Sequence, residues 1–402
     1  MATRTATGMT NATLWDRIRS FYPSFRSHTS EATADLFTAR GFEQLAQTDS
    51  AAIDEFFGLS LRVYLLGVNS SHAKDTLEAA GFGEYFSQPF GGIVQKMAVN
   101  SIAPVSPAYM NLQNGRSVDP FIVRKPEIFE RFWKQNFNYQ SFVTISDEDQ
   151  MRQIFISEYG MSEFMSGIME GLQNGYTIQR YNNKLEALNA YLNSTERPLK
   201  DTQKVTSAIA APGDPAEDEL MGLILTVRNV VSAMDLAPQT NAYNALGFSS
   251  TQDRDRLRLL IRPGYKNAIA TKLMRNTFQS DAVNLPIDVI EVPHFGGITY
   301  TDASGAKLYP VYDVFGAMVG FNTVEGAETV TVNKDAAVAV DPNAHVIGII
   351  ADKGLIFECE QSPYKVEPIR NPRGLYTNYF ASSRNNTVAC DALYNCVVIT
   401  DN

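Results

Sequence analysis

The sequence predicts an α+β protein in which one long helix is combined with interleaved β segments. Of its 402 residues, 44% are hydrophobic and 11% aromatic, which is enough apolar side chain for a large core and excludes general disorder. Apolar residues recur at helical spacing from about residue 160 to 193, and after residue 254 short apolar runs alternate with helical and turn-rich stretches. At roughly 150 residues per domain, the length indicates two or three compact units.

Charge and cysteine content exclude several classes of protein. The 34 Lys and Arg against 44 Asp and Glu give a formal charge of −10, which excludes a strongly basic wrapper of nucleic acid. Three cysteines (Cys359, Cys390 and Cys396) are too few and too scattered for a disulfide framework or a four-ligand zinc site, and indicate a reducing compartment. We expect no signal peptide, because residues 1–21 contain no apolar stretch of the required length. We expect no membrane partner, because the most apolar run, 220–234, is interrupted by polar residues and falls short of a span.

The first third of the chain changes from helical to extended character. Ser30 and Ser50 each precede an amphipathic pattern and predict two helices. Glycines and prolines between residues 82 and 107 predict loops and edge strands. In 111–124, Asn114-Gly115 is a strong turn signal between two extended arms, and these arms contain few side chains that a core would bury. This part predicts a projecting hairpin.

The clearest single element is a helix from about Gly160 to Asn193, on the order of 50 Å long. It contains Gly167, Gly171 and Gly175, each of which costs up to about 1 kcal/mol relative to Ala. Glycines at intervals of four form a smooth stripe on which another backbone can lie closely. A helix of this length in a protein without heptads predicts a spine across a domain.

The second half predicts an α/β unit followed by a β-rich excursion. Residues 195–216 are rich in Pro, Asp and Ala and predict a linker or an exposed strand pair, and 217–236 predict an amphipathic helix. A strand at 257–261, a helix at 265–278 and a strand at 286–292 form a unit that lays a helix on a sheet. Residues 297–345 are rich in Gly, Thr and Val and predict β structure. Further strands are expected in 346–357 and 378–400.

Candidates for catalysis are weak. The four histidines do not lie near another His, Cys or carboxylate at metal-ligand spacing; they are His28, His72, His294 and His345. His294 is the most enclosed, and a histidine at a strand end usually satisfies local backbone groups. The sequence has no nucleophile elbow, no GxGxxG and no Walker loop. We therefore predict no catalytic, cofactor-binding or metal-binding residues and no cofactor.

A local excess of positive charge occurs in residues 254–275, with seven basic residues and one acidic. Three interpretations remain open: a solvated helix face with strand edges, a surface that meets acidic neighbours in an oligomer, and direct DNA binding. The last would require aromatic stacking partners, and Tyr265 is the single aromatic residue in this stretch.

The most unusual string is 370–380, Arg-Asn-Pro-Arg-Gly-Leu-Tyr-Thr-Asn-Tyr-Phe. It could be a turn that leads an aromatic strand into the core, or a junction between two domains. At this string the sequence resembles the major capsid (head) proteins of short-tailed bacteriophages of the phi-29-like group, and the order of predicted elements is also similar. The residues that carry the resemblance are Asn371, Pro372, Arg373, Gly374, Leu375 and Tyr376.

The resemblance implies the Hong Kong 97-type capsid fold. In its terms residues 1–79 are an N-terminal arm, and 80–137 are an extended loop with its flanks. Residues 138–215 are a peripheral domain around the spine helix, and 216–369 are an apical domain with an unmatched β-rich insertion near 297–350. Residues 370–402 return to the peripheral domain.

The function implied by the resemblance is structural, without enzymatic turnover. Copies of the chain would assemble into pentamers and hexamers and form the icosahedral or prolate head that encloses double-stranded DNA, which they contact without sequence specificity. A scaffolding protein, a portal and decoration or head-fibre proteins are the other implied partners. The protein would belong to the virion and assemble in the cytoplasm of the bacterial host.

Two alternatives come from other classes. An encapsulin-like nanocompartment shares the fold and would enclose an enzyme cargo. A soluble hydrolase would need His294 or His345 beside a nucleophile in a cleft.

Basic residues are the candidate contacts between subunits. In the extended loop they are Arg116, Arg124 and Lys125, and in the apical domain they are Arg262, Lys266, Lys272 and Arg275. Lys125 lies near the loop, but nothing in the sequence identifies a partner Asn or an activating carboxylate. Neither covalent cross-linking nor proteolytic maturation is therefore predicted.

Overall fold

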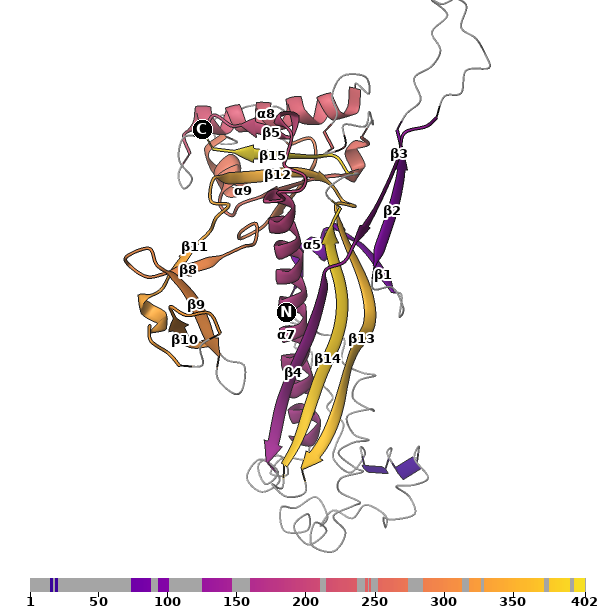
Figure 1. Cartoon of the computed structure of the whole chain (residues 1–402), viewed down its shortest axis with the longest axis vertical. Coiled ribbons are helices and arrows are strands. Elements are labelled where there is room, and N and C mark those ends of the chain that lie inside the picture. Colours follow the sequence, from indigo (N-terminus) through magenta and orange to yellow (C-terminus); the bar gives the residue numbers. More distant parts are fainter. Residues whose placement is uncertain are drawn as a thin grey trace, which may run out of the picture. The chain divides into compact units, whose positions relative to one another are not determined.

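The fold is a mixture of helices and sheets, as a computed structural model of the chain shows (Figure 1). The structure describes residues 15–16, 19–20, 74–87, 93–100, 125–146, 160–209, 215–236, 243–244, 246, 252–273, 285–312, 318–326, 329–371, 376–390 and 394–401. The two helices predicted after Ser30 and Ser50 and the turn at Asn114-Gly115 lie outside these residues. Among the described residues, no helix is both long and apolar enough to span a membrane.

The chain divides into two compact units. Unit 1 comprises Met1–Asp75, Phe137–Arg180 and Gln361–Asn385. Unit 2 comprises Thr76–Asn136, Tyr181–Glu360 and Asn386–Asn402. These bounds differ from those of the five segments expected from the sequence, whose names and limits stay a prediction.

The predicted spine helix is confirmed as α7, Gly160–Leu192, with 33 residues. Met165 and Leu172 are buried in the part that belongs to unit 1, and Leu185 and Leu188 in the part that belongs to unit 2. Both units therefore take core side chains from the same helix.

The long strands of unit 1 belong to a sheet with the order β1-β13-β14-β4. Its strands are β1 (Glu84–Ser87), β4 (Asn136–Ser146), β13 (Ile356–Asn371) and β14 (Tyr376–Ala389). Strands β4, β13 and β14 run alongside α7 (Figure 1).

Three tyrosines pack between α7 and this sheet inside unit 1. The ring of Tyr176 lies 5.4 Å from that of Tyr139 and 4.8 Å from that of Tyr364. The Tyr139 hydroxyl donates a hydrogen bond to the Leu172 carbonyl oxygen at 3.1 Å. A Cβ atom at Gly175 would lie 3.0 Å from the same hydroxyl, so this glycine is approached closely by a side chain and not by the backbone that the sequence predicted.

Unit 2 is built on a five-stranded sheet with the order β5-β15-β12-β6-β7. Its strands are β5 (Lys204–Thr206), β6 (Leu257–Ile261), β7 (Asp288–Glu291), β12 (Val346–Asp352) and β15 (Cys396–Thr400). All seven residues of β12 are buried, as a central strand requires. Strands β6 and β7 are parallel, which confirms the predicted α/β unit. The helix between them is α9 (Tyr265–Ala268), which continues as one π-helical turn, Ile269–Leu273.

Helices cover both faces of this sheet. On one face, α8 (Glu217–Leu236) packs on Leu259 and Ile399, and on the other the second half of α7 packs on Leu260 and Val398. The predicted helix 217–236 is confirmed. Its first turn is acidic, and the Glu219 carboxylate accepts the Ala216 amide at 2.8 Å, which satisfies a free backbone donor at the helix start.

Of the two interpretations of residues 195–216, a linker or an exposed strand pair, the structure favours the strand, which is Lys204–Thr206. Strand β5 pairs in parallel with β15. The side chain of Gln203 is fully buried, and its amide donates to the Tyr191 hydroxyl and to the carbonyl oxygens of Tyr243 and Cys396. A buried amide with three partners fixes this segment locally, although its composition is typical of loops.

Two smaller β structures complete unit 2. Strands β2 (Val94–Val99) and β3 (Ile128–Trp133) form an antiparallel ribbon on either side of residues 101–124. The predicted β-rich excursion is confirmed as a sheet with the order β10-β9-β8-β11, which we call the insert sheet. Its strands are β8 (Thr299–Thr301), β9 (Lys307–Tyr312), β10 (Met318–Asn322) and β11 (Val338–Val340). The remaining short elements are α5 (Thr76–Ala79) and the 3-10 turns Asp201–Gln203, Arg254–Arg256 and Lys334–Ala336.

A buried ion pair connects α7 to β13 within unit 2. Lys184 Nζ lies 3.6 Å from a carboxylate oxygen of Glu358, and the two side chains are 4% and 3% exposed. A carboxylate oxygen of Glu78, which is half exposed, lies 3.8 Å from the same ammonium. Removal of one partner would leave an uncompensated charge in the core.

We predict that Lys184→Met lowers the free energy of unfolding of the unassembled chain by about 3–5 kcal/mol. The double variant K184M/E358M should recover most of the loss, because no charge then remains at the two buried positions. Urea unfolding followed by circular dichroism measures both. Equal destabilisation by the single and double variants would show that the pair acts by shape and not by charge.

Candidate functional site

The described residues offer little chemistry for catalysis. They contain no group of three or more His, Cys, Asp or Glu side chains that could hold a metal ion. Cys359, Cys390 and Cys396 are buried thiols that form no disulfide, and burial raises the pKa of Cys396 to about 12, so this thiol is protonated and unreactive at neutral pH. Of the histidines, His345 is exposed, and His28 and His72 lie outside the described residues.

His294 belongs to the point where the chain leaves the core for the insert sheet. Its Nδ1 accepts a hydrogen bond from the Gly296 amide at 3.1 Å. Gly296 and Gly297 have φ of 79° and 70°, which L residues rarely adopt. The Gly297 amide donates to the Glu186 carboxylate of α7 at 2.9 Å. The histidine thus serves the backbone, as expected for the structural interpretation.

The returning chain is fixed at the same place. Asn343 is 1% exposed, and its amide donates to Asn189 Oδ1 on α7 at 3.0 Å. The guanidinium of Arg262 donates to Asp341 at 2.8 Å and to the carbonyl oxygens of Asn343 and Val346, both at 2.6 Å. We call the two chain connections between the core and the insert sheet, residues 294–297 and 341–346, together the insert junction. Because both are anchored, the insert sheet cannot pivot freely about a single linker.

The base of the β2–β3 ribbon is held by Lys96. Its ammonium donates to the Tyr394 hydroxyl at 2.5 Å and lies 3.6 Å from the Glu84 carboxylate. It also lies 4.5 Å from the centre of the Tyr394 ring and 5.0 Å from that of Phe357. Burial raises the pKa of Tyr394, so its hydroxyl keeps its proton at neutral pH. One lysine thereby joins the ribbon to β1, β13 and the segment before β15.

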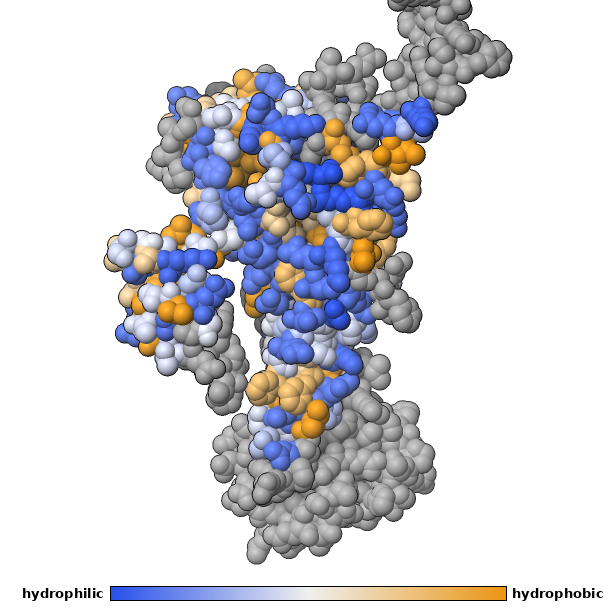
Figure 2. Space-filling view, in the orientation of Figure 1, coloured by the Kyte–Doolittle hydropathy of each residue, from blue (hydrophilic) through white to orange (hydrophobic). Residues whose placement is uncertain are grey.

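The two faces of the ribbon differ sharply. Val94 and Trp133 on the inner face are buried against Phe357 and Val388. The outer face presents four apolar side chains, Met97, Val99, Ile128 and Phe132, which are 62%, 53%, 57% and 59% exposed. Gln95 and Glu130, which are hydrogen-bonded to each other, lie on the same face, opposite Phe132 and Met97. Figure 2 shows hydrophobic residues on the surface of the ribbon, in the upper right of the view. We call these four residues the ribbon outer face. Among the described residues, no layer covers it.

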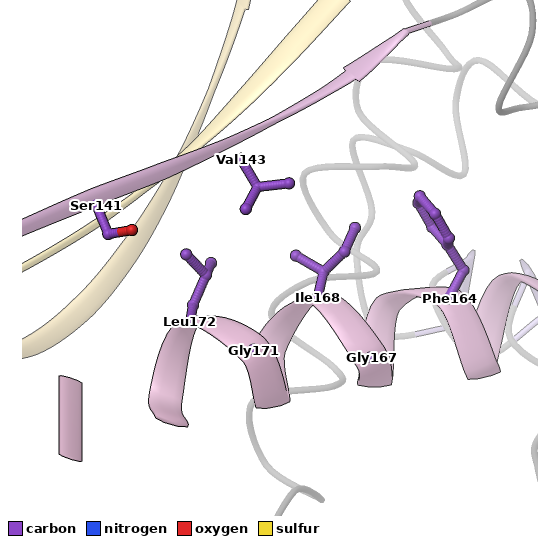
Figure 3. Close-up of a pocket in the computed structure, with 7 residues that line it drawn as sticks. All are labelled: Ser141, Val143, Phe164, Gly167, Ile168, Gly171 and Leu172. Atoms are coloured by element: carbon purple, nitrogen blue, oxygen red, sulfur yellow. The ribbon is translucent and has the colours of Figure 1, made fainter. Parts of the chain in front are cut away.

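A second open apolar surface lies within unit 1. A groove of about 420 Å³ is lined by Ser141 and Val143 of β4 and by five residues of α7: Phe164, Gly167, Ile168, Gly171 and Leu172. In Figure 3, Phe164, Ile168 and Leu172 point from the helix toward β4. A Cβ atom at Gly167 or Gly171 would meet nothing within 4 Å, so the close approach expected there is not found in the described part of the chain.

The predicted contact residues are in different situations. Lys125 and Lys266 are exposed, whereas Lys272 donates to the Pro215 carbonyl oxygen at 2.8 Å and Arg262 is engaged in the insert junction. Arg116, Arg124 and Arg275 lie outside the described residues. The contacts of all seven with other subunits stay a prediction.

The string that carries the resemblance lies inside unit 1 and connects β13 to β14. Asn371 Nδ2 donates to the Tyr376 hydroxyl at 2.8 Å, while Pro372, Arg373, Gly374 and Leu375 lie outside the described residues. Further along, Tyr379 is buried. The role of the string as a domain junction stays a prediction.

Sequence reasoning missed the ribbon outer face. The arms of the predicted hairpin were placed at 111–124, but the described ribbon strands are 94–99 and 128–133. Neither strand carries a period of two in its sequence, because two polar residues separate Phe129 from Phe132 and Val94 from Met97, so no local pattern marked two different faces.

Comparisons with known proteins identify relatives of this arrangement. The family described as "Phi29-like phage major capsid protein" matches residues 18–400. The capsid structure of Staphylococcus phage Andhra is 15% identical with a TM-score of 0.59, and 83% of this chain and 86% of that chain are covered. The structure of head fibre and inner core protein gp22 of native bacteriophage P68 is 13% identical with a TM-score of 0.53, covering 83% and 87%. No curated protein matches the sequence.

The structural similarity confirms the predicted Hong Kong 97-type capsid fold. Because the sequence identities are only 15% and 13%, the similarity supports the fold but does not identify contact residues.

Gly296 in the insert junction has a positive φ and no space for a Cβ atom. We predict that Gly296→Ala lowers the free energy of unfolding by at least about 2 kcal/mol, because φ is positive and the added Cβ would overlap the Leu185 carbonyl and the Asn189 side chain. Gly305→Ala is the matched control: φ is 84° but the space is open, so we expect a loss of about 1 kcal/mol. Thermal unfolding of both variants tests this, and equal losses would contradict it.

Acid should loosen the insert junction through His294. Burial lowers its pKa below the ordinary 6.5, with Arg262 acting in the same direction and Asp341 and Glu186 opposing. The unfolded chain then binds the proton more tightly, so this contribution to stability is complete above pH 6.5 and is lost as the pH falls below it.

His294→Asn keeps an acceptor for the Gly296 amide but does not titrate. We predict that it loses less stability than the wild type between pH 7.5 and 5.0, because the proton uptake by His294 on unfolding is then absent. Urea unfolding at the two pH values measures this, with His345→Asn at the exposed histidine as the control. The same pH dependence in all three proteins would remove His294 from the account.

Proposed function

This chain belongs to the Phi29-like phage major capsid protein family, and from this premise we propose that its copies form pentamers and hexamers that build the icosahedral or prolate head around double-stranded DNA. The protein is a structural capsid protein of a bacteriophage virion. The family match supports neither the nanocompartment nor the hydrolase alternative.

The ribbon outer face is the observation that supports assembly most directly. Four large apolar side chains on one face of two strands are unfavourable in water, and burial of apolar surface is worth about 25 cal/mol per Å². The inner face is held by Lys96, so the ribbon cannot turn over to bury the outer face in its own core. We propose that a neighbouring subunit covers it.

The mechanism we propose is conformational adaptation without chemical turnover, and no enzymatic role. One chain must fit several symmetry-related environments, and head-to-tail contacts close into rings when the rotation closes. Each contact can be modest, since many act together. The exposed Lys125 and Lys266 and, outside the described residues, Arg116, Arg124 and Arg275 are proposed contacts.

We propose further partners on the same basis. A scaffolding protein and a portal would direct assembly in the host cytoplasm, and decoration or head-fibre proteins would bind the finished head. A solved relative comes from work on a head fibre and inner core protein of bacteriophage P68, which supports such partners by similarity of fold alone. The net charge of −10 suits a wall that does not bind packaged DNA tightly. In this proposal 1–79 is the N-terminal arm, 80–137 the extended loop, and 216–369 the apical domain.

Assembly can be tested on the purified chain with and without a scaffolding protein, by negative-stain electron microscopy and light-scattering mass. We expect closed shells or capsomer rings from the wild type. We predict that Phe132→Asp lowers shell yield at least about tenfold, because it replaces an apolar side chain by a second carboxylate beside Glu130, without the Gln95 amide that Glu130 has as its partner.

Phe132→Leu is the matched control, since it also removes the ring but keeps an apolar side chain, and its yield should stay near that of the wild type. Both variants should fold, because Phe132 is 59% exposed in the chain. Shells from F132D at the wild-type yield would contradict the role of the ribbon outer face. A wild-type monomer in the presence of scaffold would contradict the proposed assembly.

A further inference from the structure

The two edges of the insert sheet differ in whether a further segment of the described chain is hydrogen-bonded to them. At the β10 edge, residues 329–332 return alongside the strand: the Phe321 amide donates to the Val332 carbonyl at 2.8 Å, and the Val332 amide donates to the Phe321 carbonyl at 2.9 Å. Asn322 Nδ2 adds a hydrogen bond to the Thr329 carbonyl at 2.6 Å. At the other edge lies β11, which pairs with β8 and has no second neighbouring strand in the described part of the chain.

Strand β11 has no charged residue, proline or bulge to protect its edge, and its length of three residues is the protection that remains. Natural proteins place charged residues, proline or a bulge on exposed edge strands, since unpaired backbone groups invite pairing with another chain. The strand is Val338-Ala339-Val340, its register with β8 is regular, and all three residues are exposed. Val338 is 55% and Val340 40% exposed, and Figure 2 shows hydrophobic residues on this lobe at the left of the view.

The side chains of this edge form a regular β-branched face. Val338 lies opposite Thr301 and Val340 lies opposite Thr299, so the four side chains occupy one face of the two strands. The sequence of β11 is the same in both directions. A second β11 laid antiparallel about Ala339 would therefore set each valine opposite a valine and continue the β-branched face, which is a favourable cross-strand arrangement.

The insert junction presents this edge in a fixed orientation. Both chain connections of the insert sheet are anchored, one through Gly297 to Glu186 and the other through Asn343 to Asn189 and Arg262. An element that is already ordered loses less entropy when it binds.

We propose that β11 pairs with β11 of a second copy of the chain, antiparallel about a two-fold axis at Ala339, and joins two insert sheets into one. In this pairing Val338 lies opposite Val340 of the partner subunit. The inference rests on the proposed function, because three residues from each copy bury far less than the roughly 1,000 Å² of a stable free interface. The contact adds to the others of an assembled shell and does not hold a dimer in dilute solution.

Two cysteine variants test the register of this pairing. In antiparallel strands, directly opposite Cα atoms are about 4.5–5.5 Å apart, within the range of a disulfide, whereas diagonal neighbours are about 7–8 Å apart and outside it. Ala339 is opposite itself, so A339C should form a disulfide-linked dimer in oxidised shells. Val340 is diagonal to itself, so V340C should give at least about tenfold less dimer. The three native cysteines are buried and do not interfere.

Two charge variants test the partner without a disulfide. V338K/V340E places Lys opposite Glu in the proposed pairing, and V338K/V340K places Lys opposite Lys. We expect the A339C cross-link to persist in the first background and to fall at least about tenfold in the second. Non-reducing gels of the purified shells measure all four proteins, and electron microscopy shows separately whether shells have formed.

The outcomes separate the two proposals. Shells without the A339C dimer, equal cross-linking of A339C and V340C, or equal dimer in both charge backgrounds would overturn the β11 pairing and leave the capsid function standing. Cross-linking that is as strong in the unassembled chain would also overturn it, as would a different protein found paired on β11. A wild-type chain that forms no shells would contradict the proposed function and this pairing together.

Discussion

The structure depends on one continuous helix that must satisfy two cores. Along its 33 residues, α7 contributes Met165 and Leu172 to unit 1 and Leu185 and Leu188 to unit 2. Its apolar residues must therefore match the packing of unit 1 in the first half of the helix and that of unit 2 in the second half. The elements that leave the core are attached to it or near it: Glu186 and Asn189 receive the insert sheet, and Lys184 pairs with Glu358 at the start of β13.

The β2–β3 ribbon and the insert sheet share one arrangement. Each is attached to the core by polar contacts and has exposed apolar side chains away from that attachment. The ribbon is fixed by Lys96 and exposes Met97 and Phe132, and the insert sheet is fixed by Arg262 and Asn343 and exposes the valines of β11. The folded chain has a well-buried core but leaves apolar side chains exposed on the ribbon and on β11. In the proposed assembly, burial of these faces between copies would supply a driving force that does not require any copy to refold.

Helical periodicity was sufficient to predict α7 and α8, and short apolar runs were sufficient for β6, β7 and β12, because these signals are local. The length of β13 was not predictable, since Pro363 and Pro368 argue against a strand; β1 pairs with Phe357–Glu360 and ends before both prolines, so neither interrupts that pairing. The contact of Lys96 with Tyr394 joins residues 298 positions apart, and nothing local in the sequence marks it. The resemblance carried by Asn371–Tyr376 supplied the family, which the pattern of elements alone did not identify.

The central claim is that a neighbouring subunit covers the ribbon outer face, and oxidation of Met97 tests it most directly. Met97 is 62% exposed in the chain, whereas Met165 is fully buried and gives the baseline. Treatment with dilute peroxide, followed by peptide mass spectrometry, gives the oxidation rate of each methionine in unassembled chain and in shells. The account predicts that Met97 reacts at least about tenfold more slowly in shells, because its thioether is then shielded from water. Equal rates in the two states would contradict it.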